Sequence, residues 1–559
     1  MRFSHNVNNG VQNDNVPYSD RTVVLQDDID LSGANWTPIG TESAPFTGEF
    51  DGSGCTITGL RVIDQDCSGL FGVASNAVLS SVVISDATIS SSAFLADPYG
   101  SGTKTGSGFN FCGVLAGTVI GESLITDCSV SGLVSGKQYT GGLVGQCGKE
   151  AGTVTICDST ADVEVYASSS YSGGLIGAIT CTKGIAEISG CRADGYVHGS
   201  GITGGFVGYI YSPATVSGCA ARGDVYSAAS CYGGFTGRIA HDDAEISGCW
   251  SSGSVWGNGG DIGSFVGRAV RGTIQNSNVC DYTSGSRPFC GNNSNIQGGV
   301  LSISEIEELS KDEYGTPWPE VRRHTYGVKE ISTAEEFLAI ADDPNGCYVL
   351  VNDIDFIGET IEPIGNYRTP FKGEFYGQGH KISNFYVDTT DKYAGLFGKI
   401  NGGRVSGLKV DKGYVTGGPD DSGLNDVGVG GFAGKIDSKS LIDNCSFIGE
   451  VWNTASCNTG GFVGYTADSP VILRCCTESY VASESGKDNT GGFVGNHGGG
   501  FIKDAYAESS VDSNAFDGGH YGNNTSGFAG SVSSSARIAA VWCYSYVSSD
   551  GYKALLFRG

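Results

Sequence analysis

Apolar residues recur along this chain in short runs of two or three that are enclosed by glycines or other small residues. The final glycines of six consecutive runs, at positions 117, 145, 177, 208, 237 and 267, are separated by 28, 32, 31, 29 and 30 residues. A fixed period of this length is the signature of a repeat protein in which each repeat is one structural rung. The runs are SGLFG (68–72), GVLAG (113–117), GGLVG (141–145), GGLIG (173–177), GGFVG (204–208), GGFTG (233–237), GSFVG (263–267), AGLFG (394–398), GGFAG (430–434), GGFVG (460–464), GGFVG (491–495) and SGFAG (526–530).

A second phrase follows many of these glycine phrases at a nearly constant distance. In it, an aliphatic or β-branched residue is followed three positions later by cysteine, and valine comes six positions after the cysteine. Short runs of Val, Ile and Thr cut by Gly, Ser, Asn and Asp are typical of strands and turns rather than of helices. The copies are SLITDCSVSGLV, AEISGCRADGYV, ATVSGCAARGDV, AEISGCWSSGSV and SLIDNCSFIGEV.

Together these patterns predict an all-β fold, a parallel β-helix (β-solenoid) built from rungs of about 30 residues. Each rung would supply two or three strands, and each strand would pair with its copy one rung away at about 4.8 Å. Stacking places Phe206, Phe235 and Phe265 above one another in a continuous core. We expect the glycines that flank them to adopt corner conformations that other residues avoid.

The chain contains two such arrays in tandem. The stretch VVLQDDIDLSGANWTPIGTESAPFTGEFDGSGCTITGLRV at 23–62 is echoed by YVLVNDIDFIGETIEPIGNYRTPFKGEFYGQGHKISNFYV at 348–387, and each opens a series of glycine phrases. The predicted organisation is a first solenoid array over 1–300, a linker and cap over 301–330, and a second array over 331–559.

Short helices are expected to cap the arrays. The segment ISTAEEFLAIA at 331–341 has the Ser or Thr start and the apolar spacing of a short helix. The end of a solenoid exposes unpaired backbone and apolar core, so a helix at that place protects it.

Length, composition and charge exclude several classes of protein. A chain of 559 residues exceeds the size at which one compact core stops growing, and its 90 glycines disfavour long helices. Its 33 basic and 60 acidic residues give a net charge of -27. This balance argues against nucleic acid or an anionic membrane surface as partner, because both need clustered Lys and Arg. The sequence has no apolar run of about 20 residues, so no membrane-spanning segment is predicted.

The opening DIDL, PIG and PFTGEFDG, with the GLFG and GGFVG phrases that follow, resemble the GLUG-motif repeat family of bacterial surface proteins. Members of that family include large adhesins and the non-catalytic repeat region of IgA-specific metalloproteases. The resemblance covers the chain from about residue 20 onward. It implies a secreted or cell-surface stalk or adhesive region, with host or microbial glycans or surface proteins as partners. The N-terminus lacks the apolar core of a signal peptide, so either the protein is cytosolic or its export signal lies outside this chain. The resemblance favours the second alternative.

Metal and cofactor chemistry finds no support in the sequence. The histidines never form the HExxH motif of zinc proteases, and the cysteines never form CxxC. We therefore predict no metal site and no cofactor. The seven histidines are His5, His198, His241, His324, His380, His497 and His520.

Cysteine repeats with the rungs. Rungs about 4.8 Å apart bring stacked cysteines within reach of a disulfide. We favour instead a buried ladder of thiols, in which cysteine is a small apolar filler. The total of 19 leaves at least one thiol unpaired in either case. The predicted ladder is Cys128, Cys157, Cys191, Cys219 and Cys249 in the first array, with Cys445 and Cys475 in the second.

Aromatic side chains beside the repeated valines form the candidate ligand-binding site. If the valines 134, 163, 197, 225 and 255 point inward, strand alternation turns their neighbours outward. Exposed aromatic rings in a row on a flat sheet make a platform for sugar rings. The alternative is that these rings shield the strands or pack under loops. The candidates are Tyr196, His198, Tyr226 and Trp256, with Trp452 and Tyr480 in the second array.

Adjacent acids are weak candidates for catalysis. Asp242 and Asp243 follow one another, as do Asp420 and Asp421. Glycosidases need two acids at a controlled separation, whereas sequence neighbours on a turn usually point apart, so we interpret both pairs as solvated loops. His497 and His520 stand in glycine-rich turns without a placed partner, and we interpret each as structural or solvated.

The predicted function is therefore a non-enzymatic, extracellular or cell-surface bacterial repeat protein. It would act as an adhesin-like module that binds glycans or proteins, or as a rigid stalk. The alternative is a carbohydrate-active enzyme, a polysaccharide hydrolase or lyase on a β-helix scaffold. That enzyme would need acids that converge from adjacent rungs, and no such acids are evident at matching repeat positions.

Overall fold

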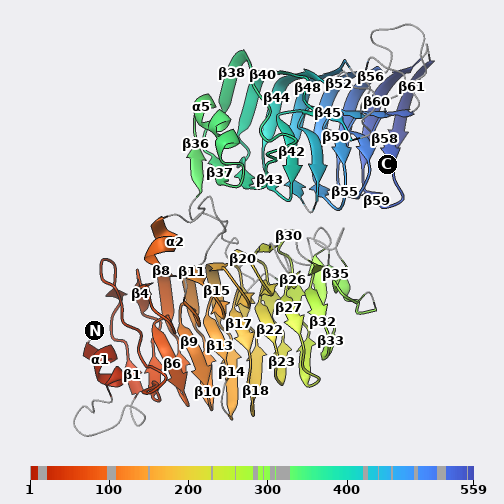
Figure 1. The fold of residues 1–559 in the computed structure, drawn as a ribbon. Helices are drawn as coiled ribbons and strands as arrows, with labels where there is room; N and C mark the ends of the chain where they lie inside the picture. The colour runs from red at the N-terminus through yellow and green to blue at the C-terminus, as the bar shows by residue number, and fades with distance from the viewer. Residues whose placement is uncertain are drawn as a thin grey trace. The chain divides into compact units, whose positions relative to one another are not determined.

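The computed structural model is an all-β parallel β-solenoid, which confirms the predicted fold class, and its strands are stacked rung upon rung (Figure 1). The chain forms two compact units, a first unit, Met1–Tyr326, and a second unit, Gly327–Gly559. The described residues are 2–9, 22–96, 109–148, 151–227, 231–257, 260–280, 288–293, 295–301, 309, 328–418, 426–438, 440–454, 458–483, 489–512, 524–549 and 552–558.

Among the described residues, the first unit contains four sheets of parallel strands. The nine-stranded sheet consists of β1 (Thr22–Val24), β3 (Glu49–Asp51), β7 (Val78–Ser80), β10 (Ser123–Thr126), β14 (Thr153–Cys157), β18 (Ile185–Ser189), β23 (Ala214–Ser217), β28 (Ala244–Ser247) and β33 (Thr273–Gln275). The 14-stranded sheet consists of β2 (Ile29–Asp30), β4 (Thr56–Thr58), β5 (Arg61–Ile63), β8 (Val83–Ser90), β11 (Ser129–Gly136), β15 (Thr160–Ala167), β19 (Arg192–Ala193), β20 (Val197–Gly199), β24 (Ala220–Ala221), β25 (Val225–Ser227), β29 (Trp250–Ser251), β30 (Val255–Gly257), β34 (Asn278–Cys280) and β35 (Gly299–Leu301).

Two shorter sheets complete each rung of the first unit and carry the glycine phrases. The five-stranded sheet consists of β12 (Thr140–Gly141), β16 (Ser172–Gly173), β21 (Thr203–Gly204), β26 (Cys231–Gly233) and β31 (Asp261–Gly263). The seven-stranded sheet consists of β6 (Phe71–Ser75), β9 (Ala116–Ile120), β13 (Val144–Cys147), β17 (Ile176–Ile179), β22 (Val207–Ile210), β27 (Thr236–Ile239) and β32 (Val266–Ala269).

The second unit repeats this plan. Its first eight-stranded sheet consists of β36 (Lys329–Ile331), β37 (Cys347–Leu350), β39 (Glu374–Tyr376), β43 (Arg404–Ser406), β47 (Leu441–Asp443), β51 (Val471–Leu473), β55 (Gly500–Lys503) and β59 (Ala536–Ala539). The other eight-stranded sheet, here named the groove sheet, consists of β38 (Ile354–Thr360), β40 (Lys381–Thr389), β44 (Lys409–Gly417), β48 (Ser446–Asn453), β52 (Cys476–Ser483), β56 (Tyr506–Asp512), β60 (Trp542–Ser549) and β61 (Tyr552–Arg558).

The glycine phrases of the second unit lie on two five-stranded sheets. One consists of β41 (Tyr393–Ala394), β45 (Gly428–Gly430), β49 (Asn458–Gly460), β53 (Asn489–Gly491) and β57 (Asn524–Ser526). The other consists of β42 (Phe397–Asn401), β46 (Ala433–Asp437), β50 (Val463–Thr466), β54 (Val494–His497) and β58 (Ala529–Val532). Strand β61 pairs with β60 in the antiparallel direction and ends the groove sheet.

The predicted phenylalanine column is present in the core. The rings of Phe206 and Phe235 are 4.7 Å apart, and those of Phe235 and Phe265 are 4.8 Å apart, with both pairs stacked. In the second unit, the ring of Phe462 lies 4.9 Å from that of Phe493. Each ring is fully buried, so every added rung extends one apolar core instead of starting a new one.

The glycines of these phrases are needed for a different reason from the predicted one. Gly204, Gly205 and Gly208 do not have the positive φ angles that only glycine adopts readily. An added Cβ atom on Gly205 would instead overlap the carbonyl oxygen of Gly234, its copy in the next rung. The corner needs glycine because the backbones of successive rungs approach closely there, which leaves no space for a side chain.

Each unit has a short helix near its start, and the first unit has another after β8. Helix α5 (Ala334–Leu338), followed by the 3-10 helix η2 (Ala339–Asp342), begins with a capping box formed by Thr333 and Glu336. Its Phe337 is buried, with its ring 6.0 Å from Phe356. Helices α1 (Arg2–Asn8) and α2 (Ser92–Ala96) were not predicted individually. Within the described residues, we find no helix with the length and apolar character of a membrane span.

Candidate functional site

A column of small buried side chains follows the turn between two sheets of the first unit, and we name it the thiol column. Its members are Cys128, Ser159, Cys191, Cys219 and Cys249, all buried. The backbone N–H of Cys128 donates to Ser159 Oγ at 3.1 Å, and that of Cys219 donates to Cys249 Sγ at 3.4 Å. These hydrogen bonds join successive rungs along the thiol column. Cys445 and Cys475 repeat the arrangement in the second unit at 3.5 Å.

The structure does not place Cys157 in this column. Cys157 ends β14, pairs with Thr126 and Ser189, and is half-buried, while Ser159 occupies the column position two residues later. The same shift puts Val165, rather than the predicted Val163, in the row with Val134 and Val197, although Val163 is also buried.

A turn residue marks the true register. The residue directly before the thiol column has a positive φ in successive rungs, 53° at Asp127 and 48° at Asp158. Asp, Asn and Gly tolerate this conformation best, and glycine fills the place at Gly190 and Gly218. The Asp before Ser159 could therefore have identified the serine as the column member from sequence.

Alkylation should distinguish the half-buried Cys157 from the buried cysteines of the thiol column. Cys191 exposes 1% of its surface, so the reagent does not reach its sulfur. In another member of the column, Cys128, burial also raises the pKa to about 12, which makes the reactive thiolate scarce. We expect iodoacetamide to modify Cys157 in the native protein and to leave Cys191, one rung away, unmodified until denaturant is added. Peptide mass spectrometry reads both sites in one digest. Modification of Cys191 at the rate of Cys157, or disulfides among the column cysteines in denaturant, would contradict the arrangement.

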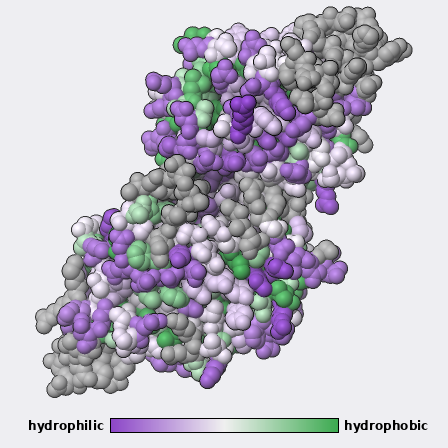
Figure 2. Space-filling model, in the orientation of Figure 1, coloured by the Kyte–Doolittle hydropathy of each residue, from purple (hydrophilic) through white to green (hydrophobic). Residues whose placement is uncertain are grey.

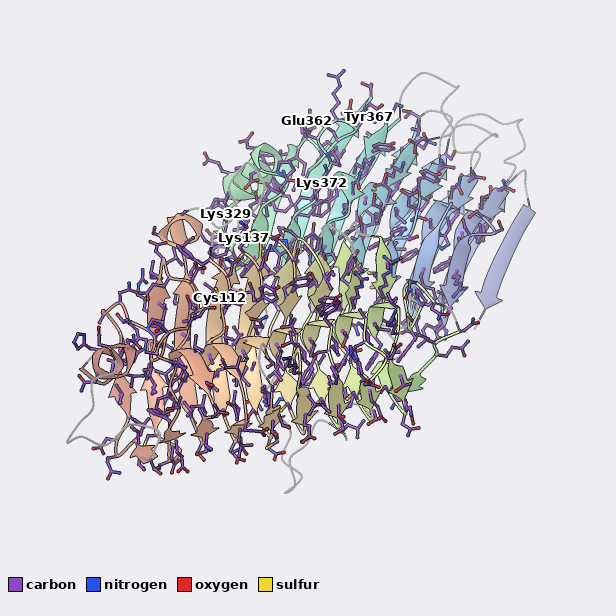
Figure 3. The ribbon with its side chains drawn as sticks, turned by 60° about the horizontal axis from the view of Figure 1, so that its bottom comes forward. Cys112, Lys137, Lys329, Glu362, Tyr367 and Lys372 are labelled. Carbon is purple, nitrogen blue, oxygen red and sulfur yellow. The ribbon has the colours of Figure 1, made fainter. Side chains whose placement is uncertain are left out.

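Other cysteines also lie inside the strands. Cys112 is buried in the first unit, where Figure 3 labels it, and burial raises its pKa well above the ordinary thiol range. All cysteines that the structure describes with their side chains are free thiols. Among described residues, no cluster of three or more His, Cys, Asp or Glu side chains has the arrangement of a metal site.

The aromatic row of the first unit is buried, contrary to the prediction that it is exposed. Tyr196, His198 and Trp256 expose 2%, 5% and 1% of their surface, and Tyr226 is half-buried. Val197, between Tyr196 and His198, belongs to the buried core, so alternation turns these two rings to the opposite side of the chain. They are then covered, so they offer no open platform to a sugar ring.

Packing among the rings themselves explains much of this burial. The ring of His198 lies 4.8 Å from that of Tyr226, and Tyr226 lies 5.7 Å from Trp256. Phe94 of helix α2 packs against Tyr166 at 5.2 Å at the start of the row. The alternative interpretation, rings that shield strands and pack under other segments, describes this row.

The second unit differs, because the outer face of its groove sheet is open. A groove of about 1150 Å³ runs across seven strands from β38 to β60, along the direction in which the rungs stack. On the visible face of this unit, Figure 2 shows mostly hydrophilic residues with a few apolar patches. Tyr386 and Tyr544, which line the groove, expose 45% and 46% of their surface.

The floor of the groove is a row of very small residues. Gly413 pairs with Gly449, Gly449 with Ser479, and Ser479 with Ser509 on successive strands. The strand register shifts just before Gly413, which indicates a bulge that bends the sheet inward. Beneath the floor lie glycine phrases: an added Cβ on Gly492 would come 3.0 Å from Ser509 Cβ. The rungs are thin here because small residues face glycines across the interior.

Two rows of outward-pointing side chains form the walls. On each strand one wall residue precedes the floor residue and the other follows it. The first wall contains Ile448, Glu478, Glu508 and Tyr544, paired in this order from β48 to β60. The second wall contains Tyr386, Tyr414, Glu450, Tyr480, Ser510 and Tyr546, paired in this order from β40 to β60.

The tyrosines of the second wall are uncharged rings with hydroxyl groups. Tyr386 and Tyr414 lie 5.4 Å apart between ring centres, and Tyr480 lies 5.2 Å from Trp452 of the neighbouring row. Desolvation raises the pKa of both Tyr414 and Tyr480. The nearby carboxylate of Glu450 adds to this effect at Tyr414, and that of Asp512 adds to it at Tyr480. Both phenols therefore stay protonated at neutral pH.

Carboxylates give the groove its charge. Trp452 Nε1 donates to Glu450 Oε2 at 3.0 Å, and the Tyr506 hydroxyl donates to Glu508 Oε2 at 2.8 Å. Asp355, at the β38 end, accepts from Asn384 Nδ2 at 2.8 Å, and this bond is the main reason that its pKa is lowered. Among the described residues that line the groove, Asp355, Glu450, Glu478 and Glu508 are acidic and Lys412 is basic.

The sequence predicted some residues of the groove, and sequence reasoning missed others. Trp452 and Tyr480 were predicted, and they lie beside or on the second wall. Glu478 and Glu508 are directly paired on adjacent rungs, so the prediction that acids are absent from matching repeat positions is wrong. They stand three residues after Cys475 and Ala505, and alignment on those positions would have found them.

The remaining candidates stay outside the groove. Asp242 binds Arg271 at 3.0 Å and is exposed, as is Asp243, which agrees with solvated loops. His497 is buried, with Nδ1 2.7 Å from Thr466 Oγ1 and Nε2 3.1 Å from the Arg537 carbonyl, and burial lowers its pKa.

Two further predictions lie outside the described residues. They are the acid pair Asp420 and Asp421, and His520.

Comparison with known proteins gives short or distant similarities. No family model matches the chain, so the resemblance to GLUG-motif proteins stays a prediction. A candidate Gly-rich membrane protein of Evansella cellulosilytica is 38% identical over 77 residues, 12% of this chain and 9% of that protein. Halomucin of Haloquadratum walsbyi is 32% identical over 143 residues, 25% of this chain and 1% of that protein. The chain therefore spans a small part of either relative.

Among solved structures, the chain is similar to a candidate immunoglobulin A1 protease from Bacteroides ovatus. The TM-score is 0.37 and the identity 17%, over 54% of this chain and 86% of that one.

Proposed function

We propose that the second unit is a glycan-binding module of a secreted or cell-surface protein, and that the groove across β38 to β60 is its binding site. The observation that carries this proposal is an open groove with a small-residue floor and exposed tyrosine rings along its wall. Aromatic faces bury the apolar faces of sugar rings, while their hydroxyls and nearby carboxylates accept and donate hydrogen bonds. Of the predicted aromatic candidates, this proposal retains those of the second unit, Trp452 and Tyr480, and leaves out those of the first.

The placement at the cell surface has separate support. One sequence relative is named a Gly-rich membrane protein and another halomucin. The acidic composition, with a net charge of -27, favours partners that are not polyanions. The buried core of stacked rungs in each unit also suits a rigid stalk that presents such a module, and stalk and binding roles are compatible.

One observation favours a second candidate, a polysaccharide hydrolase or lyase. Glu478 and Glu508 are paired on adjacent strands, which places their backbones about 4.8 Å apart. Retaining glycosidases hold two carboxyl groups at a separation of about 5 Å. The same groove could therefore cleave the chain that it binds.

A single experiment tests both candidates. The purified protein is incubated with immobilised mucin, plant and bacterial polysaccharides, and both retained protein and new reducing ends are measured. We expect retention on at least one polysaccharide with no release of reducing ends. Release that disappears in Glu478→Gln would establish the enzyme instead. Absence of both retention and release across the panel would contradict the glycan-binding proposal.

A further inference from the structure

We infer that the groove selects extended glycans that carry protonated amino groups, with one sugar unit per rung. This inference rests on the proposed glycan-binding function and adds the chemical class of the ligand. Its basis is the combination of a repeated spacing along the groove with a repeated charge on its walls.

The spacing of the groove is that of the rungs. Its floor contributes one residue per strand, from Gly413 through Gly449 and Ser479 to Ser509, at intervals of about 4.8 Å. An extended chain of β-1,4-linked hexopyranoses advances by nearly the same distance per sugar and turns over at each linkage. Successive sugars therefore lie over successive rungs, with their substituents directed alternately to the two walls. An extended peptide advances by about 3.4 Å per residue and falls out of step with the rungs.

The charge of the groove lies on both walls. Glu478 and Glu508 are adjacent on the first wall, and Glu450 lies on the second wall, directly paired with Tyr480. A polymer lying between the walls passes carboxylates on either side of the floor. Uronic or sialic acids would be repelled along this path, whereas ammonium groups would gain an ion pair at each of several rungs.

The basic side chain of the groove does not offset this charge where the acids gather. Lys412 belongs to β44, and its charge helps to lower the pKa of Asp355 on β38. The acidic stretch Glu450, Glu478 and Glu508 covers the next three strands, β48, β52 and β56. The selective part of the groove is therefore this stretch, with Tyr480 at its middle strand.

The test compares defined hexamers by calorimetry at low salt and about pH 5.5, between the ordinary titration ranges of carboxylates and amines. The probes are hexamers of β-1,4-linked N-acetylglucosamine, of the deacetylated sugar and of β-1,4-linked mannuronic acid, with hexalysine as a peptide of like charge. We expect the deacetylated hexamer to bind about tenfold more tightly than the acetylated one, since several exposed ion pairs add modest energies. The mannuronate hexamer should not bind, and higher salt should reduce the preference.

Variants locate the selectivity. In Glu478→Gln/Glu508→Gln, the ratio of the two hexamer affinities should fall toward one. The matched control, Glu187→Gln/Glu245→Gln, removes the same charge from exposed positions of the first unit and should leave the ratio unchanged.

Equal binding of both hexamers, or a preference that survives in the groove variant, would overturn the inference while leaving glycan binding intact. Hexalysine binding as tight as that of the deacetylated hexamer would overturn the choice of glycan over basic peptide. Failure of every glycan, the defined hexamers and the broader polysaccharide panel alike, would contradict the proposed function itself.

Discussion

Replacing Gly205 by alanine should destabilise the first unit by about 3 kcal/mol, at the upper end of what overpacking costs. Gly205 lies in a glycine phrase, where its backbone touches that of the next rung. An added Cβ would overlap the carbonyl oxygen of Gly234 and lie 3.2 Å from Val225 Cγ2. Backbone atoms cannot rotate away as a flexible side chain can, so two rungs must separate and lose their parallel pairing.

Gly218 provides the matched control in the same unit. It has a φ of +60°, but open space surrounds the position of its missing Cβ. Gly218→Ala should therefore cost only the strain of a left-handed alanine, about 1 kcal/mol. Urea unfolding is followed by hydrogen exchange of peptides from β22 and β27. It gives the free energy of unfolding of the first unit in both variants. A larger loss for Gly218→Ala than for Gly205→Ala would show that dihedral angles, not rung contacts, select the glycines.

The same contrast explains which part of the fold the sequence could predict. The period of the glycine phrases, with Phe206 and Phe235 one rung apart, determines a stacked core, because identical side chains in a stack must meet. The reason for the glycines was not accessible from sequence. A corner dihedral and a close backbone approach both select glycine, and only coordinates show that Gly205 has an ordinary φ and no space beside it.

Two features of the site could not be predicted from the sequence: the exact register of each rung, and the segments that pack over the outer side of a sheet. In the rung of Cys157, the column position is occupied by Ser159, and the cysteine lies two residues earlier at the end of β14. Matching by residue type therefore selected Cys157 instead of Ser159. Alternation turns Trp256 away from the buried Val255, but it carries no information about what packs over that side, and Trp256 is buried. The groove of the second unit depends on a bulge beside Gly413 and on the exposure of residues such as Tyr386.

Removing two rings from the second wall should weaken glycan binding by about 50-fold. Tyr414 and Tyr480 flank Glu450 on the middle strands of the groove. A sugar stacked on either ring buries part of its apolar face, which is worth about 1 kcal/mol or more per ring. Two such losses correspond to between one and two factors of ten in Kd. The variant Tyr414→Ala/Tyr480→Ala is measured by calorimetry with the best-retained polysaccharide of the panel.

Folding should survive this change, because both side chains point outward from the groove sheet and the core beneath them is untouched. The control variant is Tyr211→Ala/Tyr367→Ala, which removes two rings that are 59% and 55% exposed and lie outside the groove. It should bind as the unmodified protein does, with the same urea midpoint. If both double variants lose affinity equally, the tyrosines act through general surface properties and the groove is not the site. If only Tyr414→Ala/Tyr480→Ala loses affinity, the repeated wall of the solenoid is the surface that meets the glycan.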